Sequence, residues 1–141
     1  MEQQKIKILH QSLKAKWYRM IESGEKQEEY REATVYWLRR LVWDDDFDQP
    51  ILDEDVKFFL ENPAAIENMF DCGWKPVPYT HVQFSLGYPK KNDESRRMTF
   101  ELKGIVYREG REEWGAEKGK KYLVEVLGRR TTLDGTILWE G

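Results

Sequence analysis

Residues 24–31 read Gly-Glu-Lys-Gln-Glu-Glu-Tyr-Arg, and they follow a short and regular opening of the chain. Apolar and polar residues alternate at 5–11, which predicts a first strand. A helix is expected at about 13–23, directly before the quoted stretch. For the charged residues that come next, periodicity alone does not decide between strand and helix. The strand and helix therefore predict a rigid support for residues 24–31.

The ends of this expected helix have their own signals. Ser12 is a plausible N-cap, because its hydroxyl can accept a hydrogen bond from a free backbone N–H. Gly24 stands where a glycine commonly ends a helix, since its missing Cβ permits the left-handed backbone. The expected buried stripe of the helix consists of Leu13, Trp17, Met20 and Ile21.

The best candidate site lies just after this glycine. Lys26, Glu29 and Arg31 fall within six residues of one another. They offer cationic donors for a phosphate or a base edge, and one carboxylate for proton transfer or for accepting an amino hydrogen. On a strand, Glu29 and Arg31 share a face, whereas Lys26 joins them only if the turn redirects it. An exposed, salt-bridged strand is the alternative interpretation.

The start of the helix adds two candidate ligand-binding residues. Lys14 and Lys16 flank the helix start, where backbone donors and lysines together can meet a phosphate. Ser12 and Lys14 are the two that we assign to ligand binding. His10 and His81 are weaker candidates for lining the same cleft.

At this point the sequence resembles a known family. Residues 24–31 match all four fixed positions of the G-x-K-x-x-E-x-R signature of the ASCH domain, the activating-signal-cointegrator homology family. The opening, with Trp17 and Ile21 before Ser23-Gly24, is also similar to that family, and so is the stretch at 121–128. The match covers about residues 5–34, with a looser one over about 80–128.

The resemblance implies a fold and a function. The implied fold is α+β, a small PUA-like β-barrel with flanking helices and a cleft beside the signature. The implied role is binding of RNA or of a nucleotide-bearing ligand in a cleft lined by Lys26, Glu29 and Arg31. We expect the ends of these three side chains to lie within roughly 10 Å around one concavity.

Some bacterial members of the family are amidohydrolases that deacetylate acetylated cytidine with a lysine, a threonine and a glutamate. Lys26 matches their lysine, but Glu29 occupies the position of their threonine. An amidohydrolase in which Lys26 and Glu29 are catalytic is therefore the alternative function. Other members are described as nucleases, which leaves RNA hydrolysis as a further alternative.

Composition sets the outer limits. The chain has 141 residues, which suits one domain, and 40% of them are hydrophobic, which is enough for a packed core. No apolar run approaches the roughly 18 residues of a membrane helix, and no secretory signal opens the chain. A single cysteine, Cys72, excludes an internal disulfide, and no zinc-ligand spacing exists. We therefore expect a cytoplasmic protein without a metal or a cofactor.

Charge is distributed unevenly around the formal net charge of −3. Residues 1–43 hold nine Lys/Arg against six Asp/Glu, residues 44–72 one against ten, and residues 73–141 thirteen against ten. The middle segment has no counterpart in the ASCH resemblance. We interpret residues 44–78 as an acidic, mainly helical insertion in a single domain spanning 1–141. A solvated charged face is the first interpretation of this segment, and a protein-interaction module that uses it as a docking surface is a third alternative function.

The last third of the chain changes period. Alternation at 82–88, 98–102 and 122–126 predicts strands, with the apolar positions facing the core. A final strand is expected at 136–139, after a turn signal at Leu133-Asp134-Gly135. These strands and the first one predict the curved sheet or barrel of the α+β fold.

Overall fold

The computed structural model describes residues 5–139, and the contacts within the chain divide it into two compact units. The first unit consists of Met1–Glu29, Pro78–Gly104 and Glu125–Gly141. The second consists of Tyr30–Val77 and Ile105–Val124, so it contains nearly all of the expected insertion at 44–78. Between residues 5 and 139, no helix is both long and apolar enough to cross a membrane.

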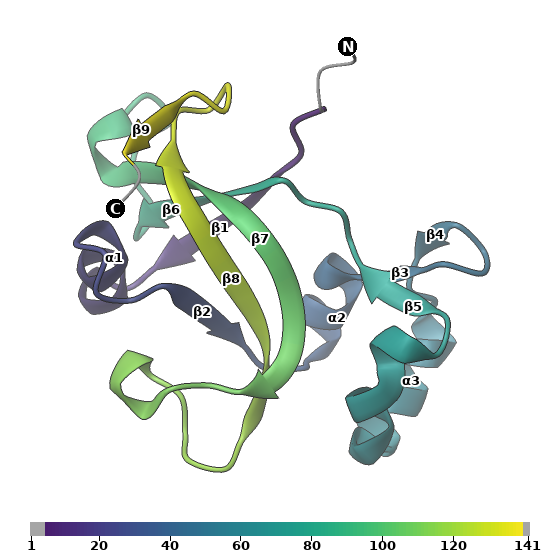
Figure 1. Cartoon of the computed structure of the whole chain (residues 1–141). Helices are drawn as coiled ribbons and strands as arrows, with labels where there is room; N and C mark the ends of the chain where they lie inside the picture. Colours follow the sequence, from purple (N-terminus) through teal and green to yellow (C-terminus); the bar gives the residue numbers. More distant parts are fainter. Residues whose placement is uncertain (1–4, 140–141) are drawn as a thin grey trace. The chain divides into compact units, whose positions relative to one another are not determined.

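The larger sheet is a curled half-barrel built from residues of both units, and the predicted α+β class is confirmed (Figure 1). The strand order is β1-β6-β7-β8-β2, and β9 pairs with β8. β1 runs parallel to β6, whereas β6 and β7 are antiparallel. The strands are β1 (Ile8–Leu13), β2 (Glu28–Arg31), β6 (His81–Leu86), β7 (Arg97–Glu109), β8 (Lys121–Thr131) and β9 (Ile137–Trp139).

The first helix, α1 (Ala15–Glu22), is shorter than expected, and the prediction that Ser12 caps it is wrong. Ser12 lies inside β1, where its register partner is Ser85, and the ladder with β6 continues to Leu13. Strand pairing therefore takes the residues that the sequence pattern assigned to the helix start. Lys14 occupies the N-cap position with extended backbone and makes no side-chain capping bond.

The buried face of α1 also differs in part from the predicted stripe. Tyr18 and Ile21 are its buried residues, while Trp17 and Met20 are only half-buried. Leu13 is buried, but from β1. Gly24 has a φ of 85°, so the left-handed turn predicted after the helix is confirmed.

The core of the sheet follows the predicted alternation in β6 and β7. The buried apolar residues are Val82, Phe84, Met98, Phe100 and Leu102. Tyr88 departs from the pattern, because β6 ends at Leu86 and leaves the Tyr88 side chain 95% exposed. A short 3-10 helix, η2 (Glu94–Arg96), follows in the loop before β7.

Strand β8 does not alternate between buried and exposed residues. Its residues 122–125 are all buried, including Glu125, whose exposed fraction is 0%. The carboxylate of Glu125 accepts a hydrogen bond from Gln11 Nε2 on β1, and Gln11 is itself 6% exposed. A strand with covered residues on both faces cannot show period two, which explains why the pattern misled here.

The second unit contains a three-stranded sheet of order β4-β3-β5, which the sequence pattern did not predict. The segment interpreted as a mainly helical insertion contains one α-helix and one 3-10 helix. The elements of this unit are α2 (Val35–Leu41), β3 (Val42–Asp44), β4 (Gln49–Pro50), α3 (Asp53–Glu61), η1 (Pro63–Asp71), β5 (Trp74–Pro76) and η3 (Glu112–Trp114).

The buried Gln11–Glu125 hydrogen bond gives a test of this core. Gln11→Leu removes a donor from a carboxylate that water does not reach, so the free energy of unfolding should fall by about 1–3 kcal/mol in urea denaturation. Gln83→Leu is the matched control, because Gln83 hydrogen-bonds to His10 at an exposed position. An equal decrease in the free energy of unfolding in both variants would contradict the expectation that the buried Gln11–Glu125 bond contributes more than an exposed one.

Candidate functional site

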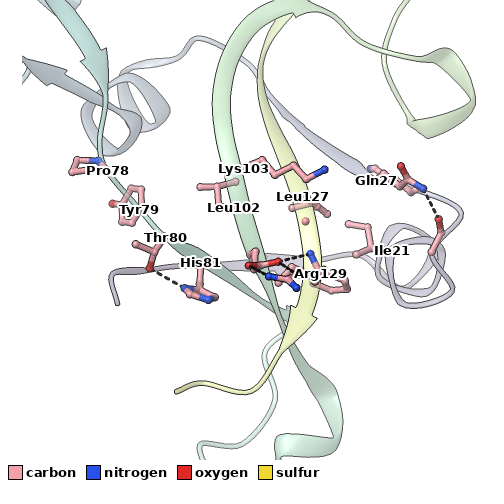
Figure 2. A pocket seen from close by; sticks show the side chains of 15 residues that line it. Ile21, Gln27, Pro78, Tyr79, Thr80, His81, Leu102, Lys103, Leu127 and Arg129 are labelled. Atoms are coloured by element: carbon pink, nitrogen blue, oxygen red, sulfur yellow. Dashed lines mark hydrogen bonds and ion pairs between the residues drawn. The ribbon is translucent and has the colours of Figure 1, made fainter. Parts of the chain in front are cut away.

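A cavity of about 790 Å³ opens in the first unit, and its volume lies within the range of small-molecule sites. Figure 2 shows Pro78, Tyr79 and Thr80 along one wall and Ile21 and Gln27 along the opposite one. The complete lining consists of Ile21, Gly24, Lys26, Gln27, Pro78, Tyr79, Thr80, His81, Phe100, Glu101, Leu102, Lys103, Leu127, Gly128 and Arg129.

The turn after α1 brings the signature to this cavity. Gly24 N–H donates to the carbonyl of Ile21 at 3.1 Å, and Lys26 N–H donates to the carbonyl of Met20 at 2.9 Å. These bonds fold the chain back across the end of the helix before β2 begins at Glu28. Lys26 therefore precedes the strand, and strand parity does not control the direction of its side chain.

Lys26 and Glu29 are brought together as the signature predicts. Lys26 Nζ lies 3.1 Å from Glu29 Oε2, and the two side chains are only 2% and 8% exposed. The ammonium group also lies 4.4 Å from the centroid of the Trp17 ring. A cation between a carboxylate and an aromatic face is held in one position, which suits a site that must be organised before its ligand arrives.

Arg31 belongs to the second unit, and its surroundings are described there. Its guanidinium carbon lies 4.5 Å from the centroid of the Trp37 ring of α2, and the residue is half-buried. The expectation that Lys26, Glu29 and Arg31 surround one concavity stays a prediction.

The other candidates taken from the start of the chain do not line the cavity. Ser12 is half-buried in β1 and Lys14 is exposed beside α1. His10 is exposed, and its Nδ1 lies 3.0 Å from Gln83 Oε1. His81, the other histidine, is in the cavity wall.

Sequence reasoning missed the charged residues that β7 and β8 contribute to the cavity. Glu101 accepts hydrogen bonds from Arg129, at 3.0 Å from the backbone N–H, 2.8 Å from Nε and 3.2 Å from Nη2. These bonds hold the pKa of the Glu101 carboxyl below its usual range. Glu101 and Lys103 share the polar parity of β7, and this was the one signal available in the sequence.

Gly128 explains how these side chains fit across β8. A Cβ at this position would lie 3.0 Å from Glu101 Cβ, 3.3 Å from Glu101 Oε1 and 3.5 Å from Lys103 Cγ. The missing side chain therefore leaves space for Glu101 and Lys103 to lie over the strand.

The opposite wall holds a fixed hydroxyl and an imidazole. Thr80 Oγ1 accepts a hydrogen bond from Lys7 N–H at 2.9 Å and lies 3.2 Å from the Lys7 carbonyl. His81 Nδ1 lies 2.8 Å from the same oxygen (Figure 2). The Thr80 hydroxyl is thus close to Lys7 N–H, the Lys7 carbonyl and His81 Nδ1. These contacts suit a group that positions His81 better than they suit a nucleophile.

The lining as a whole carries more positive than negative charge. Lys26, Lys103 and Arg129 stand against one carboxylate, Glu101. Within residues 5–139, no three His, Cys, Asp or Glu residues are grouped closely enough to hold a metal ion. The arrangement suits an anionic organic ligand, with apolar and aromatic wall on the side of Pro78 and Tyr79.

No protein-family model, curated protein or solved structure matches this chain.

The pKa of Glu101 predicts a pH dependence of stability. Its carboxyl is more acidic in the folded protein than in the unfolded chain, so the unfolded state binds more protons in acid. The stabilisation is present above the unfolded pKa of about 4.3 and is lost as pH falls through the folded pKa. The difference in unfolding free energy between wild type and Glu101→Gln should therefore shrink as the pH is lowered from about 6 to about 3.

Urea denaturation across this pH range measures the effect. Glu25→Gln is the control, because it removes an exposed carboxylate that forms no ion pair among the described residues. A Glu101→Gln difference that is constant with pH would contradict the role assigned to the Arg129 bonds.

Proposed function

We propose that this chain binds RNA or another nucleotide-bearing ligand in the cavity beside the G-x-K-x-x-E-x-R signature, as a PUA-like ASCH domain protein. The observation that carries the proposal is the coincidence of two independent features. Gly24, Lys26 and Gln27 of the signature line the same cavity as Lys103 and Arg129 from distant strands. Cationic donors beside an apolar and aromatic wall are what a phosphate joined to a base requires.

The shape of the signature turn supports the same proposal. Lys26 reaches the cavity because the chain reverses at Gly24, and its ion pair with Glu29 fixes it there. Both residues are buried, so the pair costs desolvation free energy and contributes little net stability. A function in ligand binding gives a reason for holding Lys26 at the cavity wall by such a pair.

The binding test must avoid leaving one buried charge alone. Lys26→Met by itself would strand Glu29, so the informative variant is Lys26→Met/Glu29→Gln, which removes both charges together. We expect it to bind a short single-stranded RNA or a nucleoside monophosphate about tenfold more weakly at low salt, since the cavity wall loses the N–H donors of Lys26.

Fluorescence anisotropy and calorimetry measure these affinities, with circular dichroism to confirm folding. Lys118→Ala is the control, because Lys118 is an exposed lysine outside the cavity. Arg31→Ala tests the remaining signature residue in the same way. Absence of any binding by wild type at low salt, to RNA and to monophosphates, would sink the proposal.

Hydrolysis of an acetylated nucleoside is the second candidate, because it would use Lys26 of the cavity wall and Glu29, which contacts Lys26. A general base must be able to accept a proton, and the Glu29 carboxylate beside Lys26 opposes this by favouring the ammonium form of the lysine. The cavity hydroxyl of Thr80 is tied to Lys7 and His81. We therefore expect no release of cytidine from acetylated cytidine between about pH 6 and 10, the span over which lysine and glutamate bases would act.

Chromatographic separation of cytidine from its acetylated form checks this expectation. Turnover that disappears in Lys26→Met/Glu29→Gln would reverse the ranking and make the chain a hydrolase. A third alternative is a protein-interaction module that acts through the acidic segment at 44–78. No contact among the described residues favours this alternative over the other two.

A further inference from the structure

The cations that line the cavity differ in whether they already have a partner. Lys26 is paired with Glu29, and Arg129 is held by Glu101 through two side-chain nitrogens. Among the described residues that line the cavity, Lys103 is the cation with neither a hydrogen bond nor an ion pair. It is also exposed, so its ammonium group is available to a ligand.

The direction of the Lys103 side chain decides where it can hold an anion. Its stem crosses β8 over Gly128, against which the Glu101 side chain also lies. Figure 2 shows the side chain extending towards the Gln27 side of the cavity, away from Pro78 and Tyr79. An anionic group held by Lys103 would therefore lie at one end of the cavity, and the apolar wall at the other end remains for a ring.

We propose that the ligand is a single nucleotide with a terminal phosphate, either free or at the end of an RNA chain, and that Lys103 binds this phosphate. The inference rests on the proposed function and narrows it to one class of ligand. A phosphomonoester carries close to two negative charges at pH 7, whereas an internal phosphodiester carries one. A single unpaired ammonium group selects the more highly charged of the two.

The number of unpaired cations also argues against a long strand. A protein that follows a polynucleotide neutralises several phosphates in succession, and each one adds to the salt dependence of binding. Only one unpaired lysine faces this cavity among the described lining residues. The salt dependence should therefore correspond to about one phosphate, with a slope of log K against log salt near −1.

The experiment compares matched ligands on the full chain by calorimetry. The panel contains the four ribonucleosides, their 5′- and 3′-monophosphates, inorganic phosphate, and RNA of about ten nucleotides with and without a terminal phosphate. At least one monophosphate should bind about tenfold or more tightly than its nucleoside at low salt, through one charge-assisted contact. RNA with the matching terminal phosphate should bind with similar affinity and slope.

Two variants of Lys103 and one control locate the phosphate. Lys103→Ala should remove the preference for the monophosphate over its nucleoside, while Lys103→Arg should keep most of this preference. Lys91→Ala is the control, because Lys91 is an exposed lysine of the same unit outside the cavity.

Several outcomes would overturn the inference while the proposed function stands. They are equal affinity for nucleoside and monophosphate, a preference that survives Lys103→Ala, or affinity and slope that grow with RNA length. Inorganic phosphate binding as tightly as the best monophosphate would also overturn it, because the base would then contribute nothing. No binding of any nucleic ligand by wild type would instead remove the proposed function itself.

Discussion

The arrangement of the site depends on one constraint, the burial of Lys26 beside Glu29. Two opposite charges with 2% and 8% exposed side chains have lost most of their hydration, and only good geometry compensates. That geometry requires three local features: a helix that ends at Glu22, a left-handed glycine at residue 24, and a strand that begins at residue 28. Each would be replaceable alone, but the ion pair makes them interdependent. The Trp17 ring beneath the ammonium group adds α1 itself to this set.

The sequence predicted those parts of the fold in which local signals decide the structure. The alternation in β6 and β7 placed Val82, Phe84 and Phe100 in the core, and Gly24 marked the turn correctly. The prediction from the sequence was wrong where pairing between strands far apart in the chain determines the structure. Ser12 has every local property of a helix cap, yet pairing of β1 with β6 makes it part of a strand. Glu125 stands at a polar position of an alternating strand and is nevertheless fully buried, because Gln11 supplies a donor from β1.

The candidate site divides in the same way. Lys26 and Glu29 were predictable, because a contact three residues apart across a turn is a local property. The sequence did not predict the grouping of Glu101, Lys103 and Arg129. Their proximity depends on the alignment of β7 with β8, which no local pattern encodes. Gly128 illustrates the difficulty. Gly128 matters because the side chains of Glu101 and Lys103 lie across it. The residues next to Gly128 in the sequence give no sign of this contact.

The two units carry different net charges, and this difference bears on the choice of ligand. The first unit holds 13 Lys/Arg against 11 Asp/Glu, and the second holds 10 against 15. An anionic ligand is therefore favoured in the first unit, where the cavity lies, and disfavoured over most of the second. The excess in the first unit is small, and two of its cations are held by carboxylates, Lys26 by Glu29 and Arg129 by Glu101. Such pairing makes a cavity rigid and specific, but it leaves little free positive charge for general attraction of a polynucleotide. This pairing supports the proposal that the cavity binds one well-placed phosphate and does not follow a chain of them.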